Sequence, residues 1–221
     1  MRKESAIKQT ALFNSHERNG ASLIEHHGWQ VPASFLAPEE EVGRVRGSVG
    51  LADISWMPKL DLKGYGLKTL PALGDGAFLW ALGPLHYLVT CDSARQGQVM
   101  DQLTKLGTAP ADLSLPPAVY VTDITSVYAQ FLLAGPQCRE VLSKLTSLNV
   151  SQKAFPDLSC RQSSLAHVHA IILRQDIGQT LAYCLLISRD YAESVWDSIV
   201  HAGNEYGLTP FGVKALELLG A

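Results

Sequence analysis

The sequence predicts an α+β fold with antiparallel or mixed sheets and helices packed on one face. Three observations support this prediction. Apolar segments of strand length mostly follow one another through short turns, whereas an all-parallel sheet needs a helix between nearly every pair of strands. Segments with apolar residues at helical spacing follow several of these strands. Hydrophobic residues form 47% of the 221 residues, which is enough to bury a sizeable core.

The first helix is predicted to begin at Pro38. Proline fits the first turn of a helix, and the glutamates at 39–41 favour the positive end of its dipole. The valines that follow face the core, namely Val42, Val45 and Val49. The segment 56–62 then leads into a strand. The glycine pairs at 64–66 and 74–76 are interpreted as turns, because neither completes a phosphate-binding pattern after a strand.

The middle of the chain is predicted as strand, helix and strand over 85–90, 95–106 and 118–124. A further strand over 127–134 ends at Gly135, and a short helix follows the proline after it.

A hairpin and a helix are predicted toward the C-terminus. Residues 168–173 and 181–187 are rich in strand-forming side chains and flank a polar, glycine-containing turn at 175–180. The helix that follows begins at Asp190 and Glu193, which resemble a capping pair, and it ends near Gly203.

Composition and charge exclude several classes of function. The formal net charge is −3 and Lys and Arg form no block, so we expect no nucleic-acid partner. No apolar run reaches the roughly 20 residues that span a bilayer, so we expect no membrane contact and a cytoplasmic location. The cysteines are scattered without a C-x-x-C pair, which predicts reduced and mostly buried thiols at Cys91, Cys138, Cys160 and Cys184.

Few side chains are candidates for chemistry. His167 and His169 lie two apart in a predicted strand, so their rings share a face, but no third ligand is identifiable and we expect no metal. Asp53 and Asp123 stand beside strands without a partner that would shift their pKa, so we expect cap or turn roles. No nucleophile elbow and no dinucleotide fingerprint is present, so we expect no flavin in this chain.

The run His-His-Gly-Trp at 26–29 allows two interpretations. Trp29 either closes an apolar cavity while His26 and His27 reach a polar ligand, or it packs in the core. Composition alone favours the core.

Motifs near the N-terminus resemble the glycine-cleavage T protein family in order and spacing. That family begins with T-P-L-y-x-x-H, then G-W-x-x-P, then V-R-x-x-x-G-x-F-D-V-S-H-M. The corresponding runs here begin at Thr10, Gly28 and Val45, with Trp56 in place of the motif histidine. Residues 132–136 resemble the L-x-G-P turn of the family.

The middle and the end of the chain resemble the γ subunit of heterotetrameric sarcosine oxidase still more closely. The matching runs follow in the order of that subunit: 78–89, 123–125, 132–136, 138–142, 154–160 and 191–196. Residues 210–216 also resemble the P-x-G-L-x-A-R segment of T proteins. The two resemblances together cover nearly the whole chain.

The resemblance implies the folate-binding fold of T protein and of the sarcosine oxidase γ subunit. We expect one domain over 1–221 without the C-terminal barrel of T proteins, with a division into lobes 1–115 and 116–221 as the alternative. The resemblance also implies tetrahydrofolate as the ligand. Candidates for a folate pocket are Trp29, Met57 and Tyr183.

Departures from the family pattern determine the predicted activity. The T protein carries its catalytic aspartate in an N-x-x-G-G-x-x-D-D segment, and residues 70–80 contain no such segment. Its pterin-binding stretch Y-T-G-E-x-G-x-E falls near 177–184, where Ile177, Thr180 and Cys184 replace aromatic and acidic residues. Leu216 replaces the arginine of the closing A-R pair. We therefore expect no catalytic residue and no independent activity.

These observations predict a non-catalytic accessory subunit of a sarcosine-oxidase-like, folate-linked one-carbon (demethylation) complex. Its partners would be larger flavin-containing oxidase or demethylase subunits. The alternative is a tetrahydrofolate-binding, aminomethyltransferase-like protein, and a third interpretation is a stand-alone module of another methyl-transfer pathway.

Overall fold

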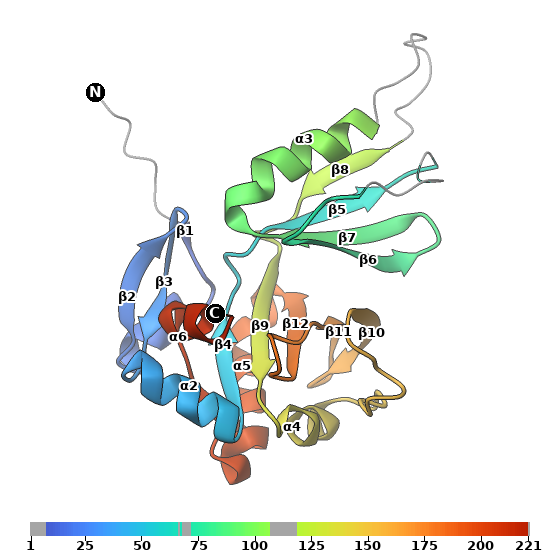
Figure 1. The fold of residues 1–221 in the computed structure, drawn as a ribbon. Helices are drawn as coiled ribbons and strands as arrows, with labels where there is room; N and C mark the ends of the chain where they lie inside the picture. The colour runs from blue at the N-terminus through green and yellow to red at the C-terminus, as the bar shows by residue number, and fades with distance from the viewer. Residues whose placement is uncertain (1–7, 66, 68–71, 107–118, 221) are drawn as a thin grey trace, which may run out of the picture. The chain divides into compact units, whose positions relative to one another are not determined.

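The chain forms two compact units. A computed structural model describes residues 8–65, 67, 72–106 and 119–220 (Figure 1). The first unit comprises Met1–Trp56 and Tyr128–Ala221, and the second, Met57–Val127, is inserted between these two segments. The boundary at 115/116, expected between two lobes, lies outside the described residues.

A six-stranded sheet is the largest sheet of the first unit, in the order β10-β11-β12-β9-β4-β13. Neighbouring strands are antiparallel except for β13 and β4, which are parallel. Its strands are β4 (Gly50–Asp53), β9 (Tyr128–Ala134), β10 (Ser159–Leu165), β11 (Val168–Arg174), β12 (Ala182–Ser188) and β13 (Thr209–Pro210). A separate sheet, β1-β3-β2, consists of β1 (Lys8–Gln9), β2 (Ser22–His26) and β3 (Trp29–Ser34).

Helices α4 (Cys138–Leu145) and α5 (Ala192–Gly203) cover one face of the six-stranded sheet. Their apolar side chains, such as Val141 and Trp196, form one buried cluster with side chains of the sheet. These include Phe131 on β9 and Leu185 on β12. Helices α2 (Pro38–Gly47) and α6 (Val213–Leu219) pack on each other, and α6 also contacts β3 (Figure 1). The shorter helices of this unit are α1 (Phe13–Arg18), η2 (Arg189–Tyr191) and η3 (Asn204–Tyr206).

The second unit is an antiparallel sheet, β6-β7-β5-β8, with one helix. Its elements are β5 (Lys59–Lys63), β6 (Ala77–Gly83), β7 (His86–Cys91), η1 (Ser93–Arg95), α3 (Gln96–Leu106) and β8 (Tyr120–Asp123). Leu60 and Val89 of the sheet and Val99 and Leu103 of α3 form its core, each without exposed surface. The unit therefore has an apolar core of its own.

Most of the predicted elements are confirmed. Pro38 is the first residue of α2, and the predicted hairpin is β11 and β12. The predicted capping pair is wrong, because Tyr191 occupies the N-cap of α5 and no side chain caps it. Residue 66 of the first predicted turn and residue 118 of a predicted strand lie outside the described residues.

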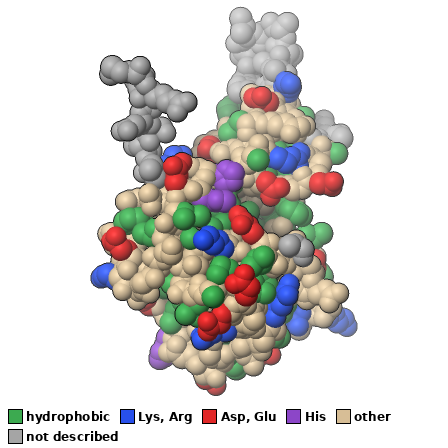
Figure 2. Space-filling model, turned by 60° about the vertical axis from the view of Figure 1, so that its left-hand side comes forward, with side chains coloured by type: hydrophobic (Ala, Val, Ile, Leu, Met, Phe, Trp, Pro, Cys, Tyr) green, Lys and Arg blue, Asp and Glu red, His purple; other side chains and the backbone are tan. Residues whose placement is uncertain are grey.

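Charged side chains of both signs are dispersed over one face of the molecule. On the face drawn in Figure 2, Lys and Arg side chains lie scattered among Asp and Glu side chains. In the part of the chain that the structure describes, no helix is long and apolar enough to cross a membrane.

A buried glutamate ties α2 to two other segments. The Glu41 side chain has no exposed surface, and its carboxylate accepts hydrogen bonds from three backbone N–H groups. Oε1 accepts from Phe35 (2.5 Å) and Leu36 (2.9 Å), and Oε2 accepts from Gly212 (3.0 Å) at the start of α6. These bonds fix α6 against α2, because a buried N–H group without a partner is costly.

Replacing Glu41 by glutamine is expected to lower the free energy of unfolding by about 2 kcal/mol, because one amide NH₂ would face a buried N–H donor. Denaturant titration followed by circular dichroism measures this change. Glu40→Gln is the matched control, because Glu40 is exposed and forms an ion pair with Arg44 on the same helix. We expect this variant to lose less than about 0.5 kcal/mol. Equal effects of the two substitutions would contradict the role assigned to Glu41.

Candidate functional site

A buried hydrogen-bonded pair joins two of the segments that resemble family motifs. His16 lies on α1 and Asp53 ends β4, and His16 Nε2 is 3.1 Å from Asp53 Oδ2. The two side chains are 2% and 0% exposed. The His16 ring packs edge-on against Phe35 and Trp196. Asp53 Oδ1 accepts hydrogen bonds from the Ser55 N–H (3.0 Å) and hydroxyl (2.5 Å), so both carboxylate oxygens are used within the protein.

The turn role predicted for the two aspartates is confirmed. Asp53 bonds the backbone two residues on, and Asp123 does the same with the Thr125 N–H at 2.8 Å. The expectation that Asp53 has no partner able to shift its pKa is wrong. Burial alone would raise the pKa of Asp53, but the hydrogen bonds from His16 and Ser55 outweigh burial and hold this pKa below its ordinary value.

The two histidines before Trp29 pack against Trp56. His27 and Gly28 form the turn between β2 and β3, both with positive φ (50° and 79°). The ring centroids of His26 and His27 lie 4.4 and 5.8 Å from that of Trp56. Burial, together with the neighbouring His27, lowers the pKa of His26. Trp56, which stands in place of the motif histidine, is therefore in contact with His26 and His27.

The structure places the three folate-pocket candidates on different elements. Trp29 lies on β3 and is 4% exposed, with the Lys8 ammonium 5.3 Å from its ring centroid. Tyr183 lies on β12 without exposed surface, and its hydroxyl donates to the Val150 carbonyl at 3.3 Å. Met57 is the first residue of the second unit and is half-buried. Their assignment to a folate pocket stays a prediction.

The predicted histidine pair does not share a strand. His167 lies in the turn between β10 and β11 with φ 69°, and only His169 lies on β11, so the expectation of two rings on one strand face is wrong. Among the described residues, no group of three or more His, Cys, Asp or Glu side chains is placed to hold a metal ion. The predicted thiols are confirmed as free, and all but Cys160 are buried.

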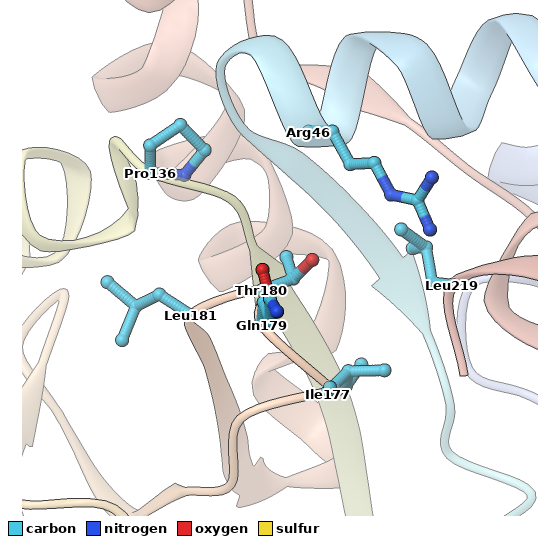
Figure 3. Close-up of a pocket in the computed structure, with 8 residues that line it drawn as sticks. Arg46, Pro136, Ile177, Gln179, Thr180, Leu181 and Leu219 are labelled. Carbon is cyan, nitrogen blue, oxygen red and sulfur yellow. The ribbon is translucent and has the colours of Figure 1, made fainter. Parts of the chain in front are cut away.

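A pocket of about 650 Å³ lies in the first unit where three of the motif segments meet the C-terminal part of α6 (Figure 3). Arg46 comes from the V-R motif on α2, Pro136 from the L-x-G-P turn, and Leu219 from α6. Residues 177–181, which the resemblance predicts to correspond to the pterin-binding stretch, form the remaining wall. Sequence reasoning named these segments singly, but it did not predict that they meet.

Arg46 is the charged side chain among the described residues that line this pocket. It projects from α2 with its guanidinium beside Leu219 (Figure 3). Within the described part of the chain, no carboxylate forms an ion pair with Arg46. Much of the lining is apolar and includes Ile177 and Leu181.

The hairpin wall of the pocket is fixed by one carboxylate. Asp176 forms two hydrogen bonds with the buried guanidinium of Arg174, at 3.1 and 2.7 Å. Its Oδ1 also accepts from the Ala182 N–H at 3.2 Å, and its own N–H donates to Asp157 at 2.9 Å. Ile177 and Thr180 close the turn through two backbone hydrogen bonds of 2.9 Å. The wall is therefore built before any ligand binds.

Solved structures with the same fold include an aminomethyltransferase and a sarcosine oxidase chain. The glycine cleavage system aminomethyltransferase T from Bartonella henselae matches 97% of this chain and 62% of its own, with a TM-score of 0.77 and 16% identity. A chain of heterotetrameric sarcosine oxidase from Corynebacterium sp. U-96, solved with pyrrole 2-carboxylate, matches 76% of this chain and 92% of its own, with a TM-score of 0.61 and 19% identity. The predicted fold class is confirmed by these likenesses.

Residues 73–221 match the family model of the GCVT N-terminal domain, and the chain belongs to this family. An aminomethyltransferase from Halothermothrix orenii is 26% identical over 96% of this chain and 64% of its own length. Sarcosine oxidase subunit alpha from Rhizobium meliloti is also 26% identical, over 96% of this chain and 25% of its own length. The chain thus spans less than two thirds of these relatives.

Proposed function

We propose that the chain is a non-catalytic accessory subunit of a sarcosine-oxidase-like, folate-linked one-carbon (demethylation) complex. The observation that supports this proposal is the lining of the 650 Å³ pocket, whose described residues include an arginine and no carboxylate. The segment that matches the pterin-binding stretch forms one wall of this pocket, and it contributes Ile177 and Thr180.

The chemistry of a pterin requires more than this pocket supplies. A pterin presents several donors and acceptors on one edge, and each that is buried without a partner costs about 1–3 kcal/mol. The nearest motif carboxylate in sequence to Arg46, Asp53, is fully buried and already bonded to His16 and Ser55. The lining therefore does not fit a pterin.

The size of the matched sarcosine oxidase chain also supports an accessory role. A match over 76% of the present chain covers 92% of that chain, so the matched chain is about as short as the present one. We infer that larger flavin-containing oxidase or demethylase subunits are the partners. The chain itself would act as one T-protein-like domain in the cytoplasm.

A tetrahydrofolate-binding, aminomethyltransferase-like protein is the second candidate. Its support is the similarity to aminomethyltransferases over 96% of the chain. The pocket would then be formed around Trp29, Met57 and Tyr183. Since Tyr183 has no exposed surface, this pocket would require the β12 core to open.

We expect no saturable binding of tetrahydrofolate to the purified chain, because no described residue of the lining supplies a carboxylate to pair with the pterin. Isothermal titration calorimetry of the wild type measures this directly. Micromolar binding that is lost in both Trp29→Ala and Met57→Ala would establish the second candidate and refute the accessory role.

Co-purification provides the positive test of the accessory role. The tagged chain is co-expressed with candidate flavin-containing oxidase subunits of the same organism, and the flavin absorbance of the purified material gives the stoichiometry. A fixed ratio of flavin to chain, together with demethylase activity that requires the complex, is expected. Flavin subunits that are fully active and never retain the chain would overturn the proposal.

A further inference from the structure

The pocket beside the 177–181 hairpin has the features of a small-molecule site. Its volume of about 650 Å³ lies within the range of pockets that enclose one small ligand. Pro136, Ile177, Leu181 and Leu219 give it an apolar lining, and Arg46 adds one positive charge. The lining thus combines apolar side chains with polar ones, and both kinds of contact occur in small-molecule sites.

The polar groups of this pocket have capacity to bind a ligand. The Arg46 guanidinium, with its five N–H donors, has no ion-pair partner among the described residues. Gln179 and Thr180 lie across the pocket from it, and the backbone of Thr180 is already satisfied by Ile177 (Figure 3). The side-chain amide of Gln179 and the hydroxyl of Thr180 can serve as additional hydrogen-bond donors to a ligand.

We propose that this pocket binds a small monocarboxylate with a compact apolar body. The carboxylate pairs with Arg46, whose planar guanidinium matches a carboxylate in a bidentate geometry. The apolar body lies against Ile177, Leu181 and Leu219. A second carboxylate is disfavoured, because the described lining offers one cation. The hairpin held by Asp176 is preformed, which reduces the ordering cost of binding. This inference goes beyond the accessory role and does not depend on it.

Methyl NMR tests the proposal on the full chain with benzoate and hexanoate as probes. Benzoate or hexanoate is expected to shift the methyl signals of Ile177, Leu181 and Leu219 in a saturable manner. Benzamide, which has the same ring without the charge, is expected to bind at least about tenfold more weakly, which corresponds to about 1.4 kcal/mol. Arg46→Gln is expected to weaken benzoate binding by a similar factor.

Arg44→Gln is the matched control. Arg44 lies on the same helix, pairs with Glu40 and does not line the pocket, so its replacement should leave the benzoate affinity unchanged. Three results would overturn the proposal: no shift of the pocket methyls by either acid up to its solubility limit, equal binding of benzamide, or equal loss in both arginine variants. Because the readout uses neither folate nor a partner chain, failure here is distinguishable from failure of the accessory role.

Discussion

Gly135→Ala is expected to lower the free energy of unfolding by about 4 kcal/mol, with contributions from backbone strain and from overpacking. Gly135 follows β9 with φ 123°, a conformation that side chains with a Cβ rarely adopt. A Cβ atom at this position would also approach the carbonyl oxygens of Val45 and Ser48 more closely than real Cβ atoms do. Both neighbours are backbone atoms at the C-terminal end of α2, so they cannot move aside cheaply.

Gly178→Ala separates the two contributions. Gly178 also has a positive φ (58°), but no atom lies within 4 Å of the position that a Cβ would occupy there. We therefore expect a loss of only about 1 kcal/mol, due to the backbone conformation alone. Urea unfolding followed by tryptophan fluorescence measures both variants. Equal losses would show that the close approach of the β9 turn to α2 has no energetic weight.

The locally paired elements could be predicted from the sequence. The hairpin of β11 and β12 and the helix α3 have apolar residues with the periodicity of a strand or a helix, and both were predicted within a few residues. The edge strand β10, Ser159–Leu165, was not predicted, because its residues are mostly polar. The parallel pairing of β13 with β4 was not predicted either, since it joins residues about 160 positions apart and no local pattern records it.

The site could be predicted only in part for a similar reason. The motif order identified the V-R, L-x-G-P and 177–184 segments, but their meeting around one pocket depends on tertiary packing. His16 and Asp53 are separated by 37 positions, so neither one indicated the other. The signal that could have paired them is the presence of an otherwise unexplained histidine and aspartate in two motifs of one family.

Asp53→Ala is expected to lower the free energy of unfolding by about 3–5 kcal/mol at neutral pH, because it leaves a buried histidine and two Ser55 donors without their acceptor. Chemical denaturation measures the change. Asp123→Ala is the matched control, since Asp123 makes the same turn hydrogen bond at an exposed position, and we expect about 1 kcal/mol.

The pH dependence of this difference identifies its cause. The pKa of Asp53 in the folded protein lies below its ordinary value. The ionised carboxylate therefore contributes its full stability above the unfolded-state pKa of about 3.9. This contribution is lost as the pH falls through the folded-state pKa. The difference between wild type and Asp53→Ala should therefore be constant above about pH 5 and shrink below about pH 4. If the difference in unfolding free energy between wild type and Asp53→Ala stays constant down to acid unfolding, the loss of stability comes from the cavity left by the side chain. The charge-assisted bond to His16 would then make no measurable contribution to stability.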